Sequence, residues 1–283
     1  TYTYAAEDSQ YEPTLCSGAD QIVEKYGSDV VSGAVNELSL AGQLCLRAGA
    51  GVVYMAQVQK ASSSLSASEV AAYLENKLWF LDDAYRIVPV GSTADIDAEI
   101  LSHVNNMSTD EEGKWRCLMT ASTATPATAE EVISTVGGYA ETLDDYRASV
   151  IYPSNARITL SDNKEYTVGA GCINAVLAGW KCAQNAKRAF TRAKINLFNS
   201  LVGIKLKNAQ MNRLAGKGVM ILTQAAEGGP IVVRHGVSTD MSSVQTRELS
   251  ITEIHDFCGK DILAALDPYI GEESITPDFI NRF

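Results

Sequence analysis

A lysine between two glycines, Gly216-Lys217-Gly218, stands directly before an apolar run, as in many phosphate-binding loops. Such a loop requires a strand, then glycines, then a helix whose N–H groups face the anion, and a P-loop also requires Ser or Thr after the lysine. Here the order is helix, glycines, strand, and Lys217 is followed by Gly218. Gly216 fits the C-cap of a helix, where carbonyls repel phosphate. Gly49 and Gly51 have the same inverted order, so the sequence predicts no nucleotide or other cofactor site.

The histidines are the other candidates for chemistry, and the chain has only three. His235, Ser238 and Asp240 are the residue types of a catalytic triad, but polar residues along one strand end point in alternating directions and do not converge. His255 and Asp256 are neighbours on a predicted helix and do not share a face. No His or Cys pair has metal-ligand spacing, and no calcium-loop motif occurs. The sequence therefore predicts no catalytic residue, no metal site and a protein that is not an enzyme.

Charge is very unevenly distributed along the chain, whose net charge is −11 over 283 residues. Residues 181–217 contain nine basic and no acidic residues. One interpretation is a phosphate footprint for nucleic acid, but Phe190 and Phe198 are the only aromatic residues nearby and the acidic remainder would repel DNA. The favoured interpretation is a basic surface that meets carboxylates of another subunit. The residues predicted for this contact are Lys181, Lys187, Arg188, Arg192 and Lys194.

An alternation of amphipathic helices and short apolar strands must position these residues. Helices predicted to begin near residues 29, 65, 92 and 125 are each followed by a strand. This order predicts an α/β fold with a mainly parallel sheet and flanking helices. From about residue 196 the order becomes helix, strand, turn, strand, long helix. We therefore expect two domains, an α/β domain over 1–195 and a small α+β helix-hairpin-helix unit over 196–283.

Three helix features are predicted in detail. Ser66 and Glu69 have the spacing of a capping box, and Thr125 is the expected N-cap of a helix with Pro126 at its first position. The long helix is expected from Ile251 to about Tyr269, because its apolar residues recur at helical spacing. These residues are Ile251, Ile254, Cys258, Ile262 and Leu266.

Composition sets further limits. Hydrophobic residues make up 46% of the chain, but no window approaches the ~20 uninterrupted apolar residues of a membrane span. The six cysteines never form a C-x-x-C pair, which favours buried free thiols in a reducing compartment. The chain begins without an initiator Met or a signal peptide, so we expect a trimmed fragment.

Residues 146–270 resemble the contractile tail sheath family of myophages, tailocins and type VI secretion machines. The resemblance lies in the order of packing motifs: "YRASVIYPS", "VGAGCINAVLAGW", "KRAFTRAKINLFNSLVGIKL", "MNRLAGKGVMIL", "PIVVRHGVST" and "RELSITEIHDFCGKDILAALDPYIG". They look like an aromatic-proline strand end, a glycine-rich helix entry, a basic stretch, a helix-to-strand step, a further strand and an inner helix. The family's Pro-Ala is replaced by Arg192-Ala193-Lys194, and its Arg-Thr pair is loosened to Arg234 and Thr239, as in a divergent member.

The resemblance implies a mechanical function without nucleotide hydrolysis. Sheath subunits stack as hexameric rings around a tail tube and contract to drive the tube through the host envelope. The implied partners are other sheath subunits, the tail tube and the baseplate, without nucleic acid or membrane insertion, in a virion tail assembled in the host cytoplasm. Residues 1–195 would hold the sheath core and 196–283 a truncated inner domain, and the basic residues would contact a subunit or the tube. Without the arms that join neighbours, this fragment is expected to be monomeric.

Two other functions remain open from the sequence. One is a small-molecule enzyme on a doubly wound α/β fold, with its site at the carboxyl ends of the strands. The other is a nucleic-acid-binding module that uses the basic stretch 181–217. A pocket with converging polar groups would favour the enzyme, and salt-dependent binding to DNA would favour the module.

Overall fold

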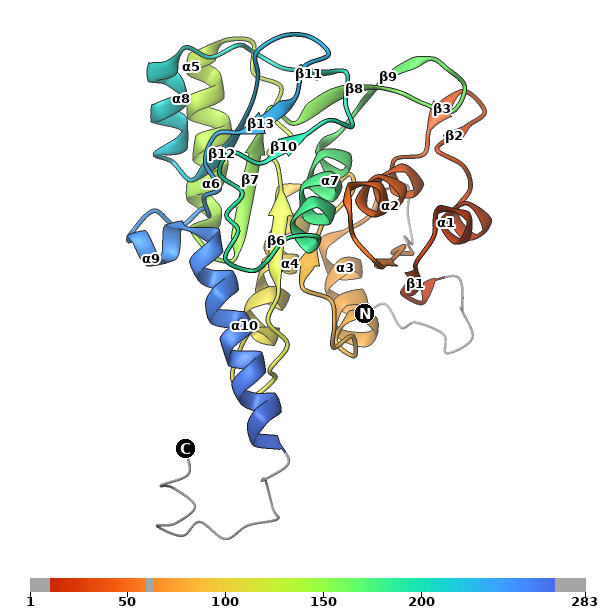
Figure 1. Cartoon of the computed structure of the whole chain (residues 1–283), viewed down its shortest axis with the longest axis vertical. Helices are drawn as coiled ribbons and strands as arrows, with labels where there is room; N and C mark the ends of the chain where they lie inside the picture. The colour runs from red at the N-terminus through yellow and green to blue at the C-terminus, as the bar shows by residue number, and fades with distance from the viewer. Residues whose placement is uncertain (1–10, 60–63, 268–283) are drawn as a thin grey trace, which may run out of the picture.

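The computed structural model describes residues 11–59 and 64–267, and its centre is a six-stranded sheet in the order β10-β13-β12-β7-β6-β5 (Figure 1). Strands β5, β6, β7 and β12 run parallel, whereas β13 pairs antiparallel with both β12 and β10. The predicted α/β class is confirmed, and the sheet is mixed. Its strands are β5 (Arg86–Ile87), β6 (Cys117–Thr120), β7 (Ala148–Tyr152), β10 (Lys194–Ile195), β12 (Val219–Gln224) and β13 (Ile231–Val233).

The central strands are mostly apolar because both faces of the sheet are covered. In β12, Met220 and Leu222 belong to the core on one face, whereas Val219 and Ile221 belong to the core on the other. Parallel pairing requires a crossover between successive strands. The crossover from β5 to β6 contains α4, and the crossover from β6 to β7 contains α5 and α6.

Helices cover the two faces as separate groups (Figure 1). Helices α2 (Glu37–Ala48) and α7 (Ala170–Cys182) pack closely on one face, and a Cβ on Gly179 would lie 2.1 Å from the carbonyl oxygen of Cys45. This contact leaves no room for a side chain at that position. The other face is covered by α3 (Ala67–Tyr73), η2 (Leu74–Leu78), α4 (Ala94–Met107), α5 (Ala129–Glu131), η3 (Val132–Val136), α6 (Gly137–Leu143) and α8 (Asn208–Ala215).

The N-terminal part departs from the expected alternation. The helix expected from residue 29 begins only at Glu37, because Ser32 and Gly33 have positive φ values that close a hairpin of β2 (Val30–Val31) and β3 (Ala34–Val35). The strand expected next is β4 (Val53–Met55), but it pairs with β1 (Thr14–Cys16) outside the large sheet. Helix α1 (Ala19–Tyr26) lies beside them, and a third small sheet contains β8 (Asn155–Thr159), β9 (Glu165–Val168) and β11 (Ser200–Val202).

The two helix N-caps predicted in detail have different outcomes. Ser66 and Glu69 form the expected reciprocal capping box at the start of α3. The cap expected at Thr125 is wrong, since the helix begins three residues later, where the Thr128 hydroxyl accepts a hydrogen bond from the Glu131 N–H at 3.2 Å. Both residues are Thr, and the cap is the one placed three residues before a glutamate.

The C-terminal part joins the same sheet. Strands β10, β12 and β13 come from both sides of residue 195, so the division into domains 1–195 and 196–283 stays a prediction. After β13 the chain forms α9 (Val244–Arg247) and α10 (Leu249–Leu266), which extends away from the sheet (Figure 1). The expected end of this helix at Tyr269 lies outside the described residues. Within the described ranges, no helix is both long and apolar enough to cross a membrane.

Candidate interaction surface

The glycine-lysine segment has the helix-glycine-strand order that excludes a phosphate loop. It lies between α8 and β12, and the Lys217 ammonium bonds both carboxylate oxygens of Glu141 on α6, at 2.6 and 2.7 Å. Gly216 is the C-cap with φ −64°, so the left-handed residue is Gly218 instead, with φ +81°. A Cβ on Gly218 would lie 2.7 Å from the Cα of Thr239. The glycines therefore serve a tight turn, and the lysine serves an ion pair.

The residues that resemble a triad do not converge. His235 Nε2 lies 2.9 Å from Glu248 Oε1, whereas the Ser238 hydroxyl donates to the backbone carbonyls of Thr246 (2.8 Å) and Asp240 (3.2 Å). A nucleophilic serine would need its hydroxyl directed at a base. This serine instead closes the loop between β13 and α9.

The buried His103 has no neighbour that suits catalysis. It lies against the Arg116 guanidinium, and burial, assisted by this positive charge, lowers its pKa to about 4. The imidazole is therefore neutral at physiological pH. Among the described residues, no group of three His, Cys, Asp or Glu side chains is arranged to hold a metal ion.

A polar cavity of about 260 Å³ lies at the carboxyl ends of β5, β6 and β7, where a doubly wound enzyme would have its site. Hydroxyl groups line it, but His, Cys, Lys and Arg are absent from its described lining. Its one carboxylate, Glu37, accepts a hydrogen bond from the Gly169 N–H at 2.8 Å at the start of α7. That carboxylate is engaged at the helix start, and no hydrogen bond joins it to a hydroxyl of the described lining, so the cavity does not favour the enzyme alternative.

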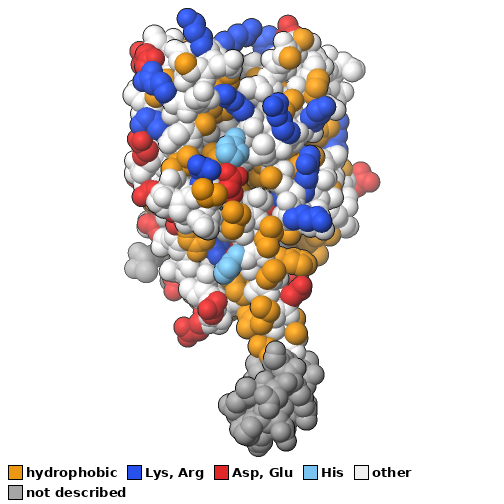
Figure 2. All heavy atoms as spheres, turned by 60° about the vertical axis from the view of Figure 1, so that its left-hand side comes forward, with side chains coloured by type: hydrophobic (Ala, Val, Ile, Leu, Met, Phe, Trp, Pro, Cys, Tyr) orange, Lys and Arg blue, Asp and Glu red, His pale blue; other side chains and the backbone are white. Residues whose placement is uncertain are grey.

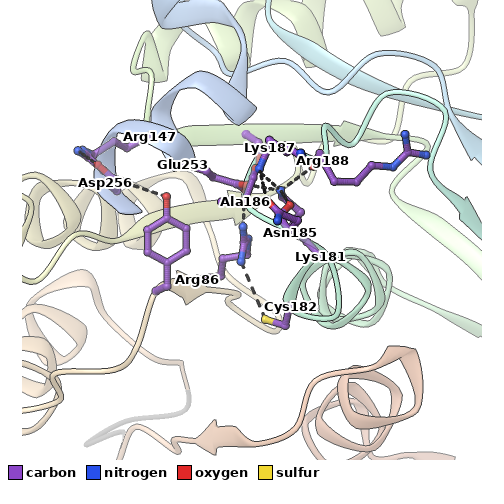
Figure 3. Close-up of polar contacts among 12 residues, drawn as sticks. Arg86, Arg147, Lys181, Cys182, Asn185, Ala186, Lys187, Arg188, Glu253 and Asp256 are labelled. Carbon is purple, nitrogen blue, oxygen red and sulfur yellow. Dashed lines mark hydrogen bonds and ion pairs between the residues drawn. The ribbon is translucent and has the colours of Figure 1, made fainter. Parts of the chain in front are cut away.

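The structure places Lys181 inside the protein. Its ammonium bonds Glu253 Oε2 at 2.5 Å and donates to the carbonyls of Asn185, Ala186 and Arg188 at 3.3, 2.9 and 2.6 Å (Figure 3). Burial lowers its pKa, while Glu253 opposes that effect. Lys181 is thus bonded within the chain, and its three carbonyl contacts hold the loop that carries Lys187 and Arg188.

The other four predicted contact residues are exposed. Lys187 and Arg188 lie on the loop after α7, Arg192 has a positive φ of 65°, and Lys194 lies on β10, the edge strand of the large sheet. Within the described ranges, none of the four forms an ion pair, unlike Lys181 and Lys217. Figure 2 shows blue side chains spread over the upper part of one face of the molecule. Lys187, Arg188, Arg192 and Lys194 thus form an exposed basic surface that extends from the loop after α7 to the edge strand β10.

Helix α10 is attached to the sheet by buried charged groups. Arg147 at the start of β7 donates to both carboxylate oxygens of Asp256, at 2.7 and 2.8 Å, and the Tyr85 hydroxyl donates to the same group at 2.8 Å (Figure 3). The side chains of Arg147 and Asp256 are each only 2% exposed. One turn earlier, Glu253 pairs with Arg86 and with Lys181. Five charged side chains from four elements or their ends therefore meet under this helix.

The apolar stripe of α10 lies on the opposite side. The buried residues of α10 are Leu249, Thr252, Glu253 and Asp256, three of which are polar. Figure 2 shows the exposed apolar side chains as an orange patch running down the helix. The exposed large apolar residues are Ile251, Ile254, Phe257, Ile262 and Leu263. The helix is thus amphipathic with its charged face inward.

Sequence reasoning missed this attachment because the partners are far apart along the chain. Asp256 is 109 residues from Arg147, and the hydrogen bond from Tyr85 spans 171 residues. One signal was present: Glu253 and Asp256 stand three residues apart on the predicted helix and share a face. Two carboxylates on one helical face are ordinarily solvated, so their burial required the structure.

No protein-family model matches the chain, but a search of known proteins finds similarity to a tail sheath protein. Over 253 residues the chain is 24% identical to the tail sheath protein of Mycobacterium phage Bxz1. The match covers 88% of this chain and 42% of that protein, so the chain spans about two fifths of its length.

Solved structures of a baseplate and of sheaths share the fold. A chain in the anti-feeding prophage baseplate superposes with a TM-score of 0.73 at 17% identity, covering 98% of this chain and 71% of that chain. A chain of the anti-feeding prophage helical sheath in the contracted state gives 0.70 at 18% identity, covering 99% and 72%. The sheath tail protein of Desulfitobacterium hafniense gives 0.57 at 14%, covering 89% and 57%. The resemblance to tail sheath proteins inferred from the sequence is thereby confirmed.

Proposed function

We propose that this chain is part of a contractile tail sheath subunit, which polymerises around a tail tube and contracts to drive it through a host envelope. The observation that carries this proposal is the fold shared with a contracted helical sheath, which extends over 99% of the chain. Sequence similarity to a phage tail sheath protein supports the same function. The partners would be other sheath subunits, the tail tube and the baseplate, in a virion tail assembled in the host cytoplasm.

The subunit would act without catalysis. In such a machine the work comes from contacts that differ between two packings of nearly rigid subunits. The buried attachment of α10 suits this role because it fixes the helix to the sheet and keeps the subunit rigid. Neighbours would be joined by terminal strands added to each other's sheets. We also propose that residues 1–195 form the sheath core, that 196–283 form the inner unit, and that this fragment alone is monomeric or nearly so.

The basic surface supplies the proposed contact residues. Lys187, Arg188, Arg192 and Lys194 are exposed and have no internal ion pair among the described residues, so each is free to face carboxylates of a neighbour or of the tube. Lys181 would act indirectly, because its ammonium holds the loop that presents two of them. Exposed pairs of this kind weaken when salt shortens the Debye length to ~8 Å at 0.15 M.

Electron microscopy of the complete protein tests the function, with tubes of stacked rings as the expected result. Replacing both Arg188 and Arg192 with Glu should leave the monomer folded and reduce tube formation, most strongly at low salt. The matched control changes Lys205 and Lys207, which are equally exposed but outside the proposed contact, to Glu. Tubes unaffected by the first pair, together with salt-dependent binding of DNA to the fragment, would instead support a nucleic-acid-binding module.

A further inference from the structure

A cavity of about 570 Å³ opens between α10 and the loop that follows α7. Ile254 and Phe257 of α10 form an apolar wall, and Cys182 at the end of α7 and Ala186 in the following loop lie opposite it. We call this the α10 cavity. Its volume is within the ~300–1,000 Å³ of typical ligand pockets, and Phe257 is 57% exposed beside it. An apolar group could therefore bury a substantial area there.

The charges around the α10 cavity are not balanced. Of its lining residues, Glu253 pairs with Arg86 and Lys181, and Asp256 pairs with Arg147 behind the cavity. Lys187 and Lys260 also line it, and neither has an ion pair within the described residues. The lining therefore has an excess of positive charge, which lies next to the apolar wall. A matching partner would thus carry an apolar side chain with carboxylates a few residues away.

The same chain presents such a segment in residues 79–83, which we call the Phe80 loop. Phe80 is 73% exposed, the highest value for a large apolar residue in the described part of the chain. Asp82 and Asp83 follow it and are exposed; Asp82 also pairs with the Lys114 ammonium of its own subunit at 3.2 Å, but its side chain is still 77% exposed. Two or three extended residues span roughly 7–10 Å. Lys260 is three residues after Phe257, a rise of about 4.5 Å along the helix, and its long side chain extends the reach of its ammonium beyond that.

The Phe80 loop is fixed in place. The Lys114 ammonium donates to the Trp79 carbonyl at 3.0 Å, and Arg116 donates to the carbonyls of Leu78 (2.9 Å) and Leu81 (2.5 Å). These bonds tie the loop to the body of its own subunit. A segment already held in one conformation loses less entropy on binding.

We propose that the Phe80 loop of one copy docks into the α10 cavity of a second copy. Phe80 packs against Ile254 and Phe257, while Asp82 and Asp83 face Lys187 and Lys260. This proposal names one contact for the sheath function proposed above and rests on it. One aromatic anchor with two exposed ion pairs gives a weak contact in the isolated chain, with a Kd of about 0.1–1 mM. Repetition through a polymer would make it effective.

Carbodiimide cross-linking of the unmodified chain tests this contact, because the reagent joins a carboxylate to an amine at contact distance. An equal mixture of ¹⁴N- and ¹⁵N-labelled chains at about 0.2 mM should yield mixed-isotope peptides that link Asp82 or Asp83 to Lys187 or Lys260. Phe80→Ser should reduce their yield at least about tenfold, as expected for the loss of a buried aromatic anchor.

Charge exchange adds a test that loss of folding cannot imitate. Chains with Lys187→Glu and Lys260→Glu should not associate with themselves, and neither should chains with Asp82→Lys and Asp83→Lys. A mixture of the two restores opposite charges at one contact and should cross-link again. Changing Asp110 and Glu111, an exposed acidic pair in another loop, to Lys is the matched control and should have no effect.

Three results would overturn the proposal: no mixed-isotope link, no recovery in the charge-exchanged mixture, or equal loss in the control. A fourth concerns another acidic and apolar segment, residues 268–283. If neutralising Glu272, Glu273 and Asp278 removes the link to Lys187 or Lys260 while Phe80→Ser does not, that segment is the occupant. Tube formation by the complete protein is a separate measurement, so failure here and failure of the sheath function are distinguishable.

Discussion

Replacing Asp256 with Asn should destabilise the protein strongly. The carboxylate accepts two hydrogen bonds from Arg147 and one from Tyr85, and the Arg147 side chain is 2% exposed. The amide removes the negative charge and turns one acceptor into a donor that faces a guanidinium. An uncompensated buried charge costs about 3–5 kcal/mol, a large share of the ~5–15 kcal/mol by which a domain is stable.

Thermal unfolding followed by circular dichroism measures this effect. A loss of 3–5 kcal/mol corresponds to a decrease in Tm of roughly 6–20 °C for a chain of this size. Asp261→Asn is the matched control, since it makes the same chemical change at an exposed position of the same helix, and it should lie within about 0.5 kcal/mol of the parent.

A double substitution separates the ion pair from the rest of the site. Removing both charges, as Arg147→Met with Asp256→Leu, should be less destabilising than either single change, because no buried charge is left unpaired. The reasoning is refuted if Asp256→Asn is as stable as Asp261→Asn. It is also refuted if the two single losses simply add in the double variant.

Three further predictions concern the core, the pH response and the exposed stripe. Gly179→Ala should lower the free energy of unfolding by at least about 1–3 kcal/mol, because the added Cβ would overlap the backbone of α2. The control is Gly138→Ala on α6, where a Cβ would have no atom within 4 Å, and this change should be neutral or stabilising. Urea titration of both variants compares them. The pKa of His103 is lowered to about 4 in the folded protein, so as pH falls the unfolded state binds a proton at this residue first. The contribution of the neutral His103 to stability is therefore complete above pH 6.5 and decreases as pH falls toward 4. His103→Gln should flatten the dependence of the free energy of unfolding on pH between those values. Phe257→Gln and Ile262→Gln should change the free energy of unfolding by no more than about 0.5 kcal/mol, since both side chains are exposed.

The parts of the fold that local patterns determine could be predicted. The order of α8, Gly216 and β12 follows from apolar periodicity and glycine placement, and so does the capping box of Ser66 and Glu69. Strand β4 has the apolar run of a sheet strand, but nothing local specifies that its partner is β1. Pairing partners depend on chain topology, which a local pattern does not contain.

The interaction surface shows the same limit at the level of single residues. Five lysines and arginines were equivalent in the sequence, yet Lys181 is buried while Lys187 and Arg188 are exposed. The difference depends on Glu253, which lies 72 positions further along and supplies the charge that permits burial. A basic run therefore indicates a charged surface. Only the fold shows which of its residues are exposed on that surface and which are buried beneath it and hold it in place.

Helix α10 connects the stability of the subunit to the proposed assembly. Its charged face is satisfied inside the protein, so the exposed apolar face has no role in attaching the helix and is available to a partner. A second copy over the α10 cavity would contact Ile254 and Phe257, and each of them directly follows a carboxylate, Glu253 or Asp256, whose buried ion pairs hold the helix. Binding would then favour the attached helix, and by linkage attachment of the helix would favour binding by the same coupling free energy. A subunit that must remain rigid while its neighbours change position gains from such an arrangement, because the contact is strongest when the helix is held in place.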